Sequence, residues 1–156
     1  MQKSVGVMGA AKAGQILKGL HSNYLEFSAP TKDDSVRVGE FVQTDGKFVK
    51  GVKGGTITGK IVGIAIANEY FSGVENSNAY PANVNVSFAY QGCIAIETST
   101  QANVGQYVFL KNDDGSLAFG DTKTKEQHTF TGFRVVYGTN GSVTGTQIIG
   151  VEGKAE

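Results

Sequence analysis

Few side chains in this sequence could carry out chemistry. The only cysteine is Cys93, and the only histidines are His21 and His128. These residues show no spacing typical of metal ligands, and the chain contains neither an HExxH nor a CxxC motif. The G-x-S-x-G turn of a serine hydrolase is absent as well. The sequence therefore offers no recognisable metal centre and no nucleophile beside a base.

The context of the remaining candidates favours structural roles. Cys93 lies in the apolar run Gly-Cys-Ile-Ala-Ile, which indicates a buried, unreactive thiol. His128 follows a run rich in Lys and Thr, typical of a solvated loop. The carboxylates of Asp33–Asp34 and of Asp113–Asp114 are sequence neighbours, so they do not face each other across a substrate, and Asp-Asp-Gly is typical of a turn. We expect no enzyme, no metal and no cofactor.

The composition predicts one domain built from strands. The 156 residues include 22 glycines and only two prolines, and the β-forming residues Val, Ile and Thr are abundant. Lys and Arg number 14, as do Asp and Glu, so no basic excess recruits nucleic acid. No segment approaches the ~20 apolar residues of a membrane span. The glycine-rich N-terminus makes a poor signal peptide, which predicts synthesis in the cytoplasm.

A short sequence pattern occurs twice and predicts part of a β-sheet. Val38–Val42 leads to Asp45–Val49, and Val104–Val108 leads to Asp113–Leu117. Each copy predicts a β-hairpin, because alternating apolar residues flank a turn that contains Asp-Gly.

Further runs of alternating or continuous apolar residues predict the remaining strands. The expected strands are Arg37–Gln43, Lys47–Val52, Thr56–Ala67, a strand through Val84, Val86 and Phe88, Cys93–Glu97, Gln106–Leu110, Phe130–Tyr137 with a bulge at Gly132, and Thr146–Val151. Glu69–Pro81 and Asp121–Gln127 are expected to be loops. Glycines within so many strands favour a sheet that curls into a barrel or a two-sheet sandwich.

A second repeated sequence pattern leaves two interpretations open. Thr58-Gly59 precedes Val62-Gly63-Ile64, and Thr144-Gly145 precedes Ile149-Gly150-Val151. Either the two halves share one strand order, or glycine-rich strands resemble one another by chance.

Charge is almost missing from one third of the chain. From Ile61 to Leu110 the only charged residues are Glu69, Glu75 and Glu97, and the polarity comes from Asn, Ser, Thr, Gln and Tyr. Two interpretations remain: a sheet buried on both faces, or a surface that contacts a partner. The nine Phe and six Tyr without any Trp argue against a glycan-binding surface and favour core or subunit contacts.

Residues 1–30 differ from the rest and predict an extended arm before a single β-domain at 31–156. Small residues dominate as far as Gly14, and Gly14 and Gly19 oppose a stable helix. An arm of this kind lies on its own domain or on a neighbour. Its candidate partner-binding anchors are apolar: Ile16, Leu17, Leu20, Tyr24 and Phe27.

The order of motifs from Ser35 to Glu152 resembles the structural cement, or capsid decoration, proteins of tailed bacteriophages. After the small-residue arm and Val38–Val42 comes a [VI]-G-[VI]-A segment, here Val62–Ala65 with Glu69. Pro81-Ala82 precedes a V-x-V strand, and Gly92–Ile96 resembles the next strand of the family. A V-G-Q-x-V-[FY] block with a downstream D-G-S-[IL] is matched by Val104–Phe109 and Asp114–Leu117.

The resemblance implies a compact, all-β domain, jelly-roll-like or barrel-like. It also implies a non-enzymatic protein of the virion that binds the outside of a mature phage capsid and bridges subunits of the major capsid protein. The partners would be the major capsid protein and a second or third copy of the chain, as a homodimer or homotrimer, with no nucleic acid and no membrane. Deleting residues 1–28 would then leave a folded domain that no longer decorates capsids. The alternatives are a phage tail, fibre or baseplate component and a glycan-binding β-module.

Overall fold

The computed structural model describes residues 11–17, 23–67 and 79–156, and these residues contain strands but no helix. The strands are β1 (Ile16–Leu17), β2 (Leu25–Pro30), β3 (Phe41–Thr44), β4 (Val49–Gly51), β5 (Lys60–Ile66), β6 (Asn85–Thr98), β7 (Tyr107–Lys111), β8 (Leu117–Gly120), β9 (His128–Tyr137) and β10 (Gln147–Lys154). The all-β prediction is confirmed. The predicted loop at Glu69–Pro81 lies mostly outside the described residues.

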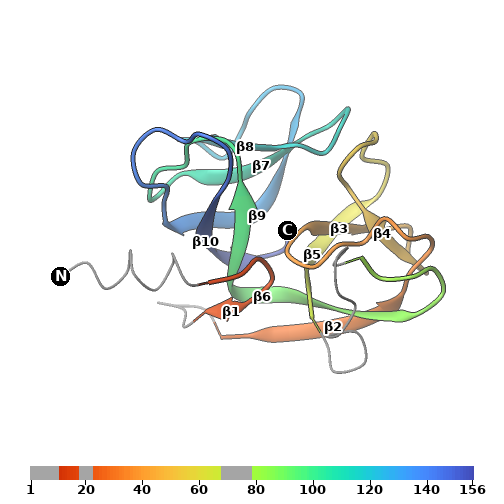
Figure 1. Cartoon of the computed structure of the whole chain (residues 1–156). Helices are drawn as coiled ribbons and strands as arrows, with labels where there is room; N and C mark the ends of the chain where they lie inside the picture. The colour runs from red at the N-terminus through yellow and green to blue at the C-terminus, as the bar shows by residue number, and fades with distance from the viewer. Residues whose placement is uncertain (1–10, 18–22, 68–78) are drawn as a thin grey trace.

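All the strands belong to one antiparallel sheet that curls into a half-barrel (Figure 1). The main path runs β4-β3-β5-β6-β10-β9-β7-β8, and β1 and β2 also pair with β6. β6 is the central element, because it pairs with four other strands: β1, β2, β5 and β10. One lobe contains β2 to β5 with the first half of β6, and the other contains β1 and β7 to β10 with the second half (Figure 1).

The prediction of two strands in β6, through Val84–Phe88 and over Cys93–Glu97, is wrong because a single strand of 14 residues spans both. Gly92 lies in its middle with a φ of 139°, a conformation that side-chain-bearing residues rarely adopt. The ring of Tyr24 packs close to its Cα, where a methyl group would crowd it. Gly92 thus bends the strand without ending it, and the bend lets one strand serve two lobes.

Both predicted hairpins are confirmed. β3 pairs with β4 around Asp45, and β7 pairs with β8 around Asp114. The Asp45 carboxylate accepts hydrogen bonds from the backbone N–H groups of Phe48 and Lys47, and these bonds lower its pKa. The hydroxyl and N–H of Ser116 do the same for the pKa of Asp114. These aspartates hold turns together, as the sequence indicated.

The two halves do not share one strand order. In the first half β5 pairs directly with β3, whereas in the second half β9 lies between β7 and β10. The bulge predicted at Gly132 is present, because the register of β9 against β7 shifts there and Gly132 has a φ of 90°. The repeated pattern in β5 and β10 is therefore a resemblance between glycine-rich strands rather than a shared strand order.

The apolar core lies on both faces of β6. One cluster receives side chains from both lobes, and a second is enclosed by β2 to β6. A third, smaller cluster joins Ala11 and Leu17 to Ala95 of β6. The largest fully buried side chains include Tyr80, Phe109, Phe133, Ile64, Ile94, Ile96, Leu110 and Ile149. Within the charge-poor stretch, Gly63–Ile66 of β5 and Gly92–Ile96 of β6 are therefore buried on both faces of the sheet.

Candidate functional site

The residues capable of chemistry are dispersed in the fold. Cys93 is buried in β6, and burial raises the pKa of its thiol to about 12, with the nearby Glu152 carboxylate adding to the rise. His128 begins β9, and one ring nitrogen lies 2.6 Å from the carbonyl oxygen of Glu126. His21 lies outside the described residues. Among the described residues, no three His, Cys, Asp or Glu side chains gather closely enough to hold a metal ion.

The buried thiol gives a direct prediction. We expect Cys93 of the folded protein to resist a thiol reagent such as DTNB at pH 8, because the reactive thiolate is scarce and access is blocked. The same protein should react fully once guanidinium unfolds it. A Val104→Cys variant is the matched control, because Val104 is 70% exposed and its thiol should react at once. Native labelling of Cys93 at the rate of that control would contradict the burial.

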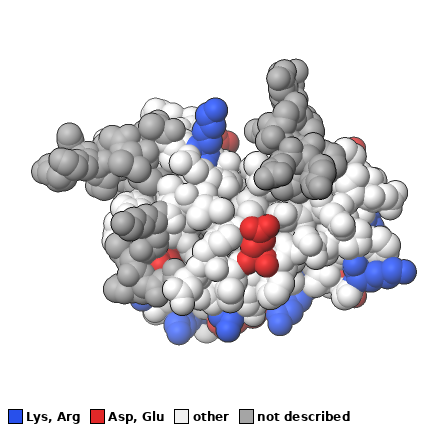
Figure 2. Space-filling view, turned by 90° about the horizontal axis from the view of Figure 1, so that it is seen from below, with Lys and Arg blue, Asp and Glu red and all other residues white. Residues whose placement is uncertain are grey.

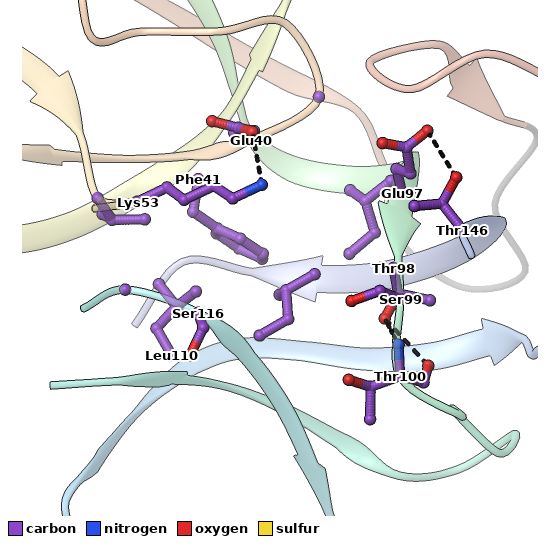
Figure 3. Close-up of a pocket in the computed structure, with 15 residues that line it drawn as sticks. Glu40, Phe41, Lys53, Glu97, Thr98, Ser99, Thr100, Leu110, Ser116 and Thr146 are labelled. Carbon is purple, nitrogen blue, oxygen red and sulfur yellow. Dashed lines mark hydrogen bonds and ion pairs between the residues drawn. The ribbon is translucent and has the colours of Figure 1, made fainter. Parts of the chain in front are cut away.

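A pocket of about 270 Å³ lies where the two lobes meet (Figure 3). Its floor is apolar and includes Phe41 and Leu110, whereas hydroxyl groups of Ser and Thr line one side. Two carboxylates lie at the pocket, and each has an interaction partner within the protein. Glu40 is 3.6 Å from the Lys53 ammonium group, and the Thr146 hydroxyl donates to Glu97 at 3.4 Å (Figure 3). The lining contains no His and no Cys, so it presents no nucleophile activated by a base.

Exposed apolar side chains gather on β1 and β2. Among the described residues the large apolar side chains with strong exposure are Ile16 (46%), Leu25 (46%), Phe27 (53%) and Val104. Three of these four belong to the two short strands that line the same edge of β6. We name Ile16, Leu25 and Phe27 with their strands the β1–β2 edge. Exposed apolar side chains along one edge of a sheet are typical of a protein contact.

The surface on this side of the molecule carries little charge. Figure 2 views the protein from below, the side on which β1 and β2 lie in Figure 1. Outside the residues that are not described, neutral side chains cover most of the face, with an acidic side chain near its middle and Lys and Arg mostly along one border. A low density of charge is a property of protein interfaces.

The structure separates four of the five predicted anchors into two groups. Leu17 packs in the small cluster with Ala95, and Tyr24 packs against the large core and bonds to Glu26 through its hydroxyl group, at 2.8 Å. These two side chains hold the N-terminal segment on its own domain. Ile16 and Phe27 are instead about half exposed, and the ring of Phe27 also packs edge-to-face on Tyr90 of β6, with 5.2 Å between the ring centroids. Leu20 lies outside the described residues.

Leu25 belongs to the β1–β2 edge but was not among the predicted anchors. The alternation of apolar residues at Leu25 and Phe27 is the signal that could have found it, because positions i and i+2 of a strand share one face. The sequence predicted an extended arm rather than a strand here, so the shared face of Leu25 and Phe27 was not recognised.

No helix among the described residues has the length and apolar character needed to cross a membrane. The profile of the structural cement protein family (E217 gp24/Pam3 gp6) matches residues 1–152. One solved structure of similar fold is "The capsid of Myoviridae Phage XM1", with a TM-score of 0.58 and 16% sequence identity. The match covers 89% of this chain and 88% of that chain. A search of curated proteins returned no match.

The family match extends over almost the whole chain, and the structural likeness shows that the fold is shared with a chain of a phage capsid structure. The alternatives of a tail, fibre or baseplate component and of a glycan-binding module are not favoured. The chain belongs to the structural cement protein family of bacteriophages and is a structural protein of the virion that binds the capsid.

Proposed function

We propose that this protein binds the outside of the mature phage head and cross-links neighbouring subunits of the major capsid protein. The observation that carries the proposal is the β1–β2 edge, where three large apolar side chains are about half exposed. In a family of cement proteins, such a surface is the natural contact with the shell. The proposed anchors remain Ile16, Leu17, Leu20, Tyr24 and Phe27, with Ile16 and Phe27 as the outward members.

The proposed mode of action is purely non-covalent. A shell expanded by packaged DNA gains stability from additional contacts across its subunit boundaries. A protein that associates with itself and touches several subunits gains affinity, because each bound contact raises the effective concentration of the next. The protein then acts without catalysis, without nucleic acid and without a membrane, and it is made in the cytoplasm of the bacterial host. The balanced charge supports the absence of a nucleic-acid partner.

Point substitutions test this surface better than truncation. Deleting residues 1–28 would remove β1 and four of the six residues of β2 (Leu25–Pro30), and would uncover an edge of β6. We instead expect Ile16→Asp to weaken binding to expanded capsid shells by roughly tenfold or more, because it places a charge in an apolar contact. The measurement is co-sedimentation with shells over a range of protein concentrations.

Val104→Asp is the matched control, because among the described residues Val104 is the strongly exposed large apolar residue outside the β1–β2 edge. It should pellet with shells like the unmodified protein. Circular dichroism should show that both variants are folded. Equal binding by Ile16→Asp and the unmodified protein would exclude Ile16 from the capsid contact.

A further inference from the structure

β2 is an edge strand with an unusual exposure. It pairs with β6 on one side. On the other side, an isolated parallel bridge joins Thr31, directly after β2, to Val49 of β4, and among the described residues no strand pairs with Leu25–Ala29. The four side chains from Leu25 to Ser28 are exposed on both faces of the strand. An edge that offers unpaired backbone groups beside apolar side chains is a template for another strand.

The backbone groups on the free side of β2 follow from its ends. Thr31 donates its N–H to Val84 at 2.8 Å, on the side of β6, and Lys32 donates to Val49 at 2.9 Å, on the opposite side. Direction alternates along a strand, so Glu26 and Ser28 direct their N–H and C=O groups away from β6. Pro30, which lacks an N–H, also faces outward, where its missing donor costs no ladder bond.

We infer that the free edge of β2 pairs antiparallel with β2 of a second copy, across a two-fold axis at Phe27. This register places Glu26 opposite Ser28 of the second copy, and the reverse, so that two complete pairs exchange four backbone hydrogen bonds. Phe27 then stands opposite Phe27 of the second copy, as a cross-strand aromatic pair. Leu25 stands opposite Ala29.

The two neighbouring registers of this strand pairing would be less stable. An axis at Glu26 would place two carboxylates directly opposite each other, which is destabilising. An axis at Ser28 would place Glu26 opposite Pro30, which has no N–H to donate. An isologous contact requires a self-complementary edge, and only the axis at Phe27 gives one without like charges or a missing donor.

This inference specifies the proposed self-association and rests on it. The paired strands join two sheets into one and hold two copies of β1 on one assembly, so each dimer offers at least two contacts to a shell. Dimerisation is measured on the purified protein without capsids. Its failure is therefore distinguishable from a failure of capsid binding.

A single-cysteine cross-link tests the register. In a non-hydrogen-bonded antiparallel pair the Cα atoms lie about 4.5 Å apart, within the range of a disulfide. Phe27→Cys should therefore form a disulfide-linked dimer under mild oxidation, read on a non-reducing gel. Leu25→Cys is the matched control, because its two copies would lie about 13 Å apart along the strands. The native Cys93 is buried and does not compete.

Rapid cross-linking of Phe27→Cys but not of Leu25→Cys would support the inference. Equal cross-linking of the two variants, or none in either, would overturn it. A second test leaves Phe27 in place and uses sedimentation velocity. Ser28→Glu should weaken the dimer by roughly tenfold, because it creates two like-charged pairs with Glu26, and adding Glu26→Lys should restore it. An unmodified protein that stays monomeric at a concentration of about 100 µM would also overturn the inference.

Discussion

Replacing Gly115 with alanine is expected to lower the free energy of unfolding by about 3 kcal/mol. Gly115 sits in the β7–β8 turn with a φ of 70°, and a methyl group there would overlap the carbonyl oxygen of Val52 from the other lobe. The turn approaches so closely because the backbone N–H of Gly54 donates to the carbonyl oxygen of Asp114 at 2.8 Å. The N–H of Ile57 likewise donates to the carbonyl oxygen of Asn112 at 2.9 Å. The added methyl group would force these backbones apart.

Gly46→Ala separates the two causes of this loss. Gly46 also has a positive φ, 103°, but a methyl group there would meet open space. Its substitution should therefore cost only the conformational strain, about 1 kcal/mol. Urea unfolding followed by circular dichroism measures both variants. Equal losses would mean that the contact between the lobes contributes nothing to stability.

Gln43→Leu is expected to cost about 2–3 kcal/mol of unfolding free energy, although it replaces a polar side chain by an apolar one of similar size. Gln43 is buried in β3. Its amide oxygen accepts the N–H groups of Thr58 and Gly59, both at 2.9 Å, and its amide nitrogen donates to the Gly51 carbonyl oxygen at 3.1 Å. Leucine would leave these three backbone groups without their partner.

The matched control is Gln147→Leu. Gln147 likewise bridges a loop, accepting the N–H of Asn140 at 2.9 Å and donating to the carbonyl oxygen of Asn140 at 3.4 Å, but those bonds are open to solvent. Water can replace them, so the loss should stay below about 1 kcal/mol. A fully stable Gln43→Leu protein would contradict the assigned role of the Gln43 amide in joining β3, β4 and the approach to β5.

The sequence predicted the elements that local chemistry determines. Both hairpins follow from turns in which an aspartate binds its own backbone, and that signal needs no distant residue. The bulge at Gly132 could be predicted from the sequence for a similar reason, because a glycine interrupts the strand pattern locally. The all-β class followed from composition.

The features that depend on distant residues could not be predicted. The sequence predicted separate strands before and after Gly92, whereas β6 runs through this glycine, and the close packing of Tyr24 beside it is visible only in the fold. Gln43 stood in a strand as one polar residue among apolar ones, and its hydrogen bonds became visible only with the loop around Thr58 in place.

The N-terminal segment shows a similar limit for the candidate site. Its apolar residues could be chosen as anchors, but which of them hold the chain to itself depends on the edge of β6. Leu17 and Tyr24 pack into clusters of the core, whereas the side chains of Ile16 and Phe27 stay about half exposed. The pairing of β2 with β6 determines which of these side chains are buried and which are exposed. The sequence of β2 did not predict a strand, so this pairing could not be foreseen.

Co-sedimentation with shells of the cognate major capsid protein, before and after expansion, tests the central claim most directly. The protein should pellet with expanded shells and saturate at a fixed ratio to the capsid subunits, while unexpanded shells should leave it in the supernatant. A folded protein that pellets with neither shell, or that binds both equally and without saturation, would contradict its role as a cement of the mature head.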